Sequence, residues 1–197
     1  MWQTLYVAIW LSVLIGLAVP LGRYMARIFT GERVFLTRVL RPLERLVYRL
    51  CGVDENREMQ AREYGSSVVV FTLAGLVLLF LLQALQRLLP LNPQGLAGVR
   101  WHTAINAAVS FVTNTNWQSY GGEYTMSYLT QMFGLAVQNF VSAAVGIAAF
   151  LAMVRGFTRK EIGTIGNFWV DITRSIVYVL LPLSFVFALF LASQGVV

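Results

Sequence analysis

Eight uncharged residues, Thr113 to Tyr120, form a polar stretch between two apolar segments of this chain. They read Thr-Asn-Thr-Asn-Trp-Gln-Ser-Tyr. Polar backbone that is not helical is tolerated at membrane depth only where protein buries it or where it lines a water-filled path. Ion-selectivity filters are made in this way, from backbone carbonyls. The octet therefore indicates ion conduction and not ordinary catalysis.

The chemistry of the octet favours potassium as the ion. No Asp or Glu occurs within it, and sites for Ca²⁺ or Mg²⁺ normally include carboxylates. An uncharged ring of carbonyls suits a monovalent ion that sheds its water, so K⁺ is the leading candidate. We expect the K⁺ ligands to come from the four residues at the start of the octet. These are Thr113, Asn114, Thr115 and Asn116.

The residues that follow are candidates for supporting roles. Trp117 and Gln118 are expected to buttress or rim the filter, and Glu123 could raise the cation concentration at its mouth. Each has a simpler alternative. Thr-Asn-Thr-Asn could be a polar turn, since Asn favours turns. Trp117 and Tyr120 could be aromatic residues of the membrane interface, and Glu123 a solvated loop charge.

Composition identifies the kind of protein that contains this octet. Of 197 residues, 57% are hydrophobic and only 12% are charged, against roughly a quarter charged in soluble chains. Nine of the fifteen basic residues lie between Arg23 and Arg62. This clustering fits the excess of basic residues in cytoplasmic loops, so the net charge of +6 does not indicate nucleic acid binding. Cys51 is a lone cysteine and His102 a lone histidine, which excludes an internal disulfide and most His-based metal sites.

Apolar segments of spanning length predict an all-α membrane protein. The region 101–112 is only twelve residues long, so we expect a re-entrant helix that dips in from outside. The partial negative charge at its C-terminal end would then favour a cation beside the octet. The filter would occupy 113–118, after which Gly121 to Glu123 would form a turn. The expected spans are 1–22, 66–86, 128–154 and 175–193.

The order of these elements predicts the domain organisation. An extra N-terminal transmembrane helix (1–22) precedes a cytoplasmic basic loop (23–65), and the pore-loop unit (66–154) follows. The remainder, 155–197, is a cytoplasmic loop and the first span of a second unit, in which Pro182 would cause a kink. Basic clusters at 23–62 and 155–160 both fall inside on this scheme, which places the N-terminus outside.

A short amphipathic helix is expected within the cytoplasmic loop. It would start at Pro42 and end at Gly52. A basic helix of this kind either lies on the membrane surface or serves as a connector packed under the bundle.

Several polar residues lie in or beside the expected spans. Gln138, Asn139 and Ser142 are near the middle of the third span, where interhelical hydrogen bonds are the more common role. Asp171 and Arg174 are expected to mark the cytoplasmic boundary of the last span.

Residues 109–120 resemble the first pore-loop signature of the KdpA family. This family comprises the potassium-binding, channel-like subunits of bacterial Kdp potassium-transporting ATPases. The resemblance covers essentially the whole chain. The flanking segments that share it are Leu89 to Gln94, Val137 to Phe140 with Ser142 to Ala144, Phe157 to Arg159, and Gly166 to Asn167 with Trp169 to Asp171.

The resemblance implies a four-part filter and a set of partners. In the family, four covalently linked pore-loop units surround one filter that selects K⁺ from outside. A separate P-type ATPase subunit hydrolyses ATP, and small accessory subunits complete the complex in the bacterial inner membrane. Thr113 to Asn116 match the family's first filter strand, and Gln118 falls where the family tunes ion affinity. The chain has neither G-x-x-x-x-G-K-[S/T] nor D-K-T-G, so we expect no ATP site and no cofactor.

The chain departs from the family in having one pore loop and the first helix of the next unit. We therefore favour a truncated product or fragment of a K⁺-translocating subunit. One alternative is a non-conducting membrane interaction module that binds partner subunits. Another is a four-fold channel assembled from identical chains.

Overall fold

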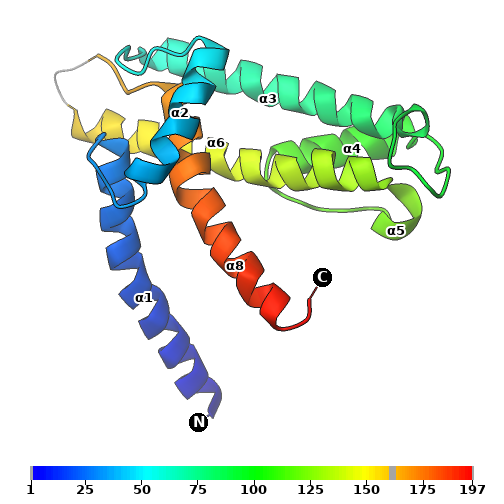
Figure 1. The fold of residues 1–197 in the computed structure, drawn as a ribbon, viewed down its shortest axis with the longest axis horizontal. Helices are drawn as coiled ribbons and strands as arrows, with labels where there is room; N and C mark the ends of the chain where they lie inside the picture. The colour runs from blue at the N-terminus through cyan, green and yellow to red at the C-terminus, as the bar shows by residue number, and fades with distance from the viewer. Residues whose placement is uncertain (1, 160–162, 197) are drawn as a thin grey trace.

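The computed structural model describes residues 2–159 and 163–196 of the chain (Figure 1). Within these residues the regular secondary structure is helical, and four helices are long and apolar enough to cross a membrane. This confirms the prediction of an all-α membrane protein. The four are Trp2–Phe29, Ala61–Ala84, Thr130–Thr158 and Phe168–Ser193.

The elements are joined by connections of up to twelve residues, the longest being 89–100. Residues 2–112 contain α1 (Trp2–Phe29), α2 (Thr37–Cys51), α3 (Ala61–Ala84), a 3₁₀ turn (Gln86–Leu88) and α4 (Trp101–Val112). Residues 122–193 contain α5 (Gly122–Thr125), a π-helical segment (Thr130–Ala136) that continues into α6 (Val137–Thr158), α7 (Phe168–Arg174), a second π-helical segment (Ser175–Leu180) and α8 (Leu181–Ser193).

Several expected boundaries differ from the structure: the first helix continues to Phe29 and not to 22, and the last span begins at Phe168 and not at 175. Helix α2 begins at Thr37 and not at Pro42, because the Val34 N–H donates to the Thr37 hydroxyl (2.9 Å) and holds the preceding loop against the first turn. It ends as expected at Gly52, whose φ of 64° allows a left-handed cap. The segment expected as a turn after the octet instead starts the single helical turn α5, which begins at Gly122.

Helices α3, α4 and α6 lie side by side, whereas α1 and α8 leave one end of this group at a steep angle (Figure 1). Small residues on α4, such as Ala104 and Ala108, are fully buried and allow close approach to its neighbours. Helix α1 buries only Ile28 among its described side chains. Most of the apolar surface of α1 and α8 is therefore left open to lipid or to other protein.

A buried ion pair closes the end from which α1 and α8 leave. Arg155 of α6 donates to both carboxylate oxygens of Asp171 in α7, one of them at 3.0 Å from Nη2. The single hydroxyl proton of Tyr64 in α3 lies between two acceptors, the same carboxylate (3.0 Å) and the Ala148 carbonyl (2.8 Å). Asp171 is only 2% exposed. Asp171 therefore joins three helices, whereas it was expected only to mark the cytoplasmic boundary of the last span.

A second buried carboxylate fixes α2 to the last span. Arg174 donates to Glu44 (3.0 Å), and the hydroxyls of Tyr48 and Tyr178 donate to it as well. Burial alone would raise the pKa of Glu44, but the hydrogen bonds from Tyr178, Arg174 and Tyr48 outweigh it and lower this pKa. Glu44 is therefore an ionised anchor for one face of α2.

Replacing Gly98 with alanine is expected to lower the free energy of unfolding by about 1–3 kcal/mol. A Cβ atom at Gly98 would overlap the Ala84 carbonyl oxygen, so α3 and the chain entering α4 would have to move apart. Thermal unfolding of the chain in detergent measures the effect. Gly146→Ala is the control, because nothing lies within 4 Å of its added Cβ. Equal melting temperatures for the two variants would contradict the prediction.

Candidate functional site

The octet follows directly from the C-terminal end of α4, the helix of twelve residues expected to be re-entrant. Helix α4 is held on α3 through Gln83, which is fully buried and donates to the Ala104 carbonyl (3.2 Å). The Val99 N–H donates in turn to the Gln83 carbonyl (3.0 Å). The position at which α4 ends is therefore set by its packing on a span.

The amides at the start of the octet all point back to the end of α4. The Thr113 N–H donates to the Val109 carbonyl (3.0 Å), and the Asn114 N–H donates to the Phe111 carbonyl (3.2 Å). The N–H groups of the next two residues share a single acceptor, the Ser110 carbonyl, at 2.9 and 3.1 Å. Four consecutive amide donors are thus satisfied within the protein.

The carbonyls of the same residues are free. Among the residues that the structure describes, no hydrogen bond is accepted by the backbone oxygens of Thr113 to Asn116. The backbone is irregular and forms no β-strand, with φ of 58° at Asn114 and 56° at Asn116. Asparagine tolerates this left-handed conformation better than most residues. The segment therefore presents carbonyl oxygens with unused lone pairs beside the partial negative charge of a helix C-terminus.

Side-chain bonds hold this backbone in place. The hydroxyls of Thr113 and Thr115 are 3.0 Å apart, and the Asn116 amide donates to the Asn114 carboxamide oxygen (3.2 Å). Ser142 of α6 donates to the same Asn114 oxygen (3.3 Å). The Ser142 hydroxyl lies closer to the Gln138 carbonyl of its own helix (2.7 Å), and its contact with Asn114 ties the segment, and not another helix, to a second span.

Ser110 is a site residue that the sequence did not single out. It is buried within α4 and its hydroxyl accepts the Trp117 N–H at 2.6 Å. With its carbonyl it therefore accepts three amides from the octet. The available signal in the sequence was a serine among the alanines and valines of the buried face of α4. Serine hydroxyls inside helices, however, more often bond to a carbonyl of their own helix.

The remaining predicted site residues lie on the exposed surface. Trp117 is 58% exposed, and Gln118 and Glu123 are exposed as well. Among the described contacts, neither Gln118 nor Glu123 bonds to Thr113–Asn116. Trp117, Thr113 and Thr115 line an open hollow of about 480 Å³ on the α4 side.

Gln86 organises the two connections on either side of the site. It is fully buried, and its amide donates to the carbonyls of Ala97 (2.6 Å) and Thr125 (2.8 Å). Its oxygen accepts the Ser127 N–H (3.0 Å) and the Thr130 hydroxyl (3.2 Å). The chain entering α4 and the chain leaving the octet are thus joined through one side chain at the end of α3.

Comparison with known proteins gives a consistent result. The KdpA family pattern, described as "Potassium-transporting ATPase A subunit", matches residues 8–197. Proteins named "Potassium-transporting ATPase potassium-binding subunit" are similar to the chain. That of Sorangium cellulosum is 58% identical over 190 residues (96% of this chain, 33% of the relative). The Clostridium botulinum (strain Eklund 17B) relative is 51% identical over 189 residues (96% and 33%), and the Methylococcus capsulatus relative 55% over 188 (95% and 31%).

The chain spans about a third of the length of these curated relatives. Its match to the family pattern nevertheless covers nearly every residue of the chain. The chain therefore belongs to the KdpA family of potassium-transporting ATPase A subunits.

Proposed function

We propose that this chain is the N-terminal part of the K⁺-binding and translocating membrane subunit of an ATP-driven, high-affinity potassium uptake complex. It contributes one of four selectivity-filter segments. The observation that carries the proposal is the backbone of Thr113 to Asn116, in which every N–H bonds to the end of α4 and no carbonyl accepts a hydrogen bond from residues 2–159 or 163–196.

These carbonyls have the chemistry that K⁺ requires. A potassium ion that leaves water must exchange its hydration shell for several neutral oxygens. The free carbonyls supply part of that shell, and α4 directs the negative end of its dipole toward them. Glu123 acts at the outer mouth by concentrating cations, while Trp117 and Gln118 support the filter from its rim.

The proposed partners supply what a single filter segment does not provide. Three further pore-loop units complete the ring, a catalytic P-type ATPase subunit supplies ATP hydrolysis, and small accessory subunits complete the complex. The open apolar faces of α1 and α8 meet these units or the lipid bilayer. The chain lies in the bacterial inner membrane with its N-terminus outside and the basic end, which contains α2, in the cytoplasm.

A second candidate function is a non-conducting membrane interaction module that binds the partner subunits. The observation in its favour is that Thr113 to Ser119 are all exposed, so that this chain forms one open wall of a filter.

Replacing Asn116 with valine in the assembled complex is expected to raise the half-saturating K⁺ concentration about ten-fold and to weaken discrimination against Na⁺. A β-branched residue at φ 56° costs roughly 1–2 kcal/mol, which the backbone avoids by turning its carbonyls away. K⁺-stimulated ATP hydrolysis and Rb⁺ uptake into proteoliposomes measure the effect.

Asn116→Gly is the matched control for this test, because glycine loses the side chain but keeps the left-handed backbone. The glycine variant should stay closer to the wild type in K⁺ affinity than the valine variant. Unchanged affinity and ion discrimination in Asn116→Val would refute the filter assignment. A complex that binds its partners through this chain but shows no K⁺ dependence would favour the interaction module.

A further inference from the structure

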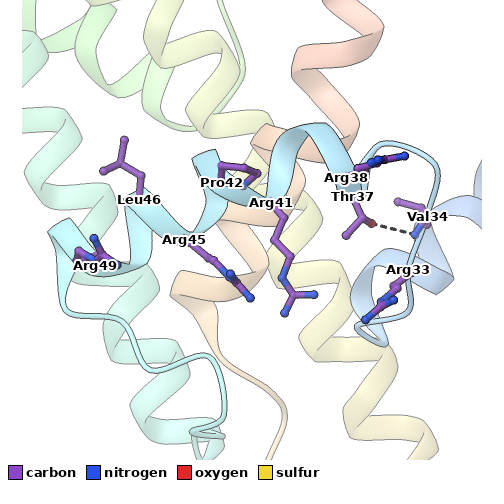
Figure 2. A pocket seen from close by; sticks show the side chains of 9 residues that line it. All are labelled: Arg33, Val34, Thr37, Arg38, Arg41, Pro42, Arg45, Leu46 and Arg49. Atoms are coloured by element: carbon purple, nitrogen blue, oxygen red, sulfur yellow. Dashed lines mark hydrogen bonds between the residues drawn. The ribbon is translucent and has the colours of Figure 1, made fainter.

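A groove of about 910 Å³ lies along α2 and the loop before it (Figure 2). Five arginines line it, one from the loop and four from the helix, together with Leu46. No acidic side chain lines this groove, and none of the five arginines takes part in an ion pair among the described residues. They are Arg33, Arg38, Arg41, Arg45 and Arg49.

The spacing along α2 separates three faces. The arginines at 38, 41, 45 and 49 follow helical spacing and form one stripe. Exposed apolar residues at 39, 43, 46 and 50 form a second stripe beside it, with Val39 72% and Leu50 76% exposed. The third face packs inward through Glu44 and Tyr48. A helix with adjacent basic and apolar stripes is typical of a membrane interface.

The protein holds this helix firmly in one place. The inward face is bonded to the last span through the Glu44–Arg174 and Glu44–Tyr178 contacts. Helix α2 crosses the end of the molecule at which α1 finishes and the last span begins (Figure 1). Figure 2 shows Arg41 and Arg45 extending to the same side of the helix, with Arg33 reaching in from the loop. The basic groove therefore lies at the end of the apolar spans, where α1 finishes and the last span begins.

We propose that this groove binds the phosphate headgroup of an anionic phospholipid in the adjacent leaflet. Guanidinium groups bind phosphate oxygens in a bidentate geometry. The stripe of Val39, Leu43, Leu46 and Leu50 beside them contacts the acyl chains of the same leaflet. An acidic protein segment would use the arginines alone, whereas an amphiphile accounts for both stripes.

The test uses the full 197-residue chain in dodecyl maltoside micelles, titrated with dioctanoyl phosphatidylglycerol or dioctanoyl phosphatidylcholine. Native mass spectrometry counts the bound lipid. We expect tighter binding of phosphatidylglycerol. The double variant R41Q/R45Q should bind it about thirty-fold more weakly, since each arginine near anionic lipid contributes roughly five-fold.

Three variants control for loss of charge, of guanidinium geometry and of fold. R62Q/R87Q removes the same charge from exposed positions outside the groove and should leave the affinity within about two-fold of wild type. R41K/R45K keeps the charge, and its affinity for phosphatidylglycerol should lie between those of the wild type and R41Q/R45Q. If circular dichroism shows that R41Q/R45Q has lost helix, the single variant R45Q replaces it, with an expected loss of about five-fold.

Three results would overturn the proposal. The first is equal binding of the two lipids, and the second is equal loss of binding in R41Q/R45Q and R62Q/R87Q. The third is that glycerol phosphate or a polyglutamate peptide at the same concentration displaces phosphatidylglycerol from the groove. That result would assign the groove to a soluble phosphate compound or to an acidic protein segment.

Discussion

Replacing Asp171 with alanine is expected to lower the free energy of unfolding by about 3–5 kcal/mol. The Asp171 side chain is 3% exposed, and its loss leaves the Arg155 guanidinium in a site where that side chain is only 15% exposed. A buried charge without its partner keeps the full cost of leaving water. The Tyr64 hydroxyl loses one acceptor in the same change, although the Ala148 carbonyl remains available to it. Thermal and denaturant unfolding in detergent measure the loss.

Two variants separate this effect from a general loss of charge. Glu32→Ala breaks the ion pair with Arg27, in which both side chains are 58% exposed, and should cost no more than about 1 kcal/mol. The double variant R155L/D171L should recover much of the stability lost in Asp171→Ala, because no lone charge remains. The prediction fails if Asp171→Ala is no less stable than Glu32→Ala.

Local sequence patterns were sufficient to predict most of the helices. Length and hydropathy separated the short helix at 101–112 from the segments long enough to span, because the bilayer sets a minimum length. The left-handed cap at Gly52 was likewise predictable, since it depends on the one residue type that adopts it freely. The start of α2 was not, because the Val34–Thr37 bond that extends it depends on the path of the preceding loop.

The candidate site was predictable only in its location. An uncharged polar octet after a short helix is visible in the sequence, but the direction of its amides and carbonyls is not. That direction depends on Ser110, which accepts amides from residues up to seven positions away. Gln86 was equally hidden, since its four bonds reach segments separated from it by 11 to 44 positions. Polar side chains that serve as tertiary junctions leave no local period in a sequence.

Replacing Gln86 with leucine is expected to lower the free energy of unfolding by at least about 3 kcal/mol. Leucine has a similar volume but cannot bond the Ala97 and Thr125 carbonyls or the Ser127 amide. Each buried group left without a partner costs about 1–3 kcal/mol. Thermal unfolding in detergent gives the size of the effect. Gln94→Leu, at an exposed position of the loop before α4, is the control and should stay within about 0.5 kcal/mol of wild type.

Gln86→Leu should also weaken K⁺ binding in the assembled complex, because Gln86 joins the chain segments on both sides of α4 and the octet. Without that junction the end of α4 is no longer held at one distance from α5, and the free carbonyls of Thr113 to Asn116 lose their fixed position. Asp171→Ala lies at the other end of the bundle, so it should reduce stability while the folded protein keeps its K⁺ affinity. Half-saturation of K⁺-stimulated ATP hydrolysis, measured for both variants below their melting temperatures, distinguishes the two roles. Equal K⁺ affinity in the two variants would show that Gln86 stabilises the fold without positioning the filter.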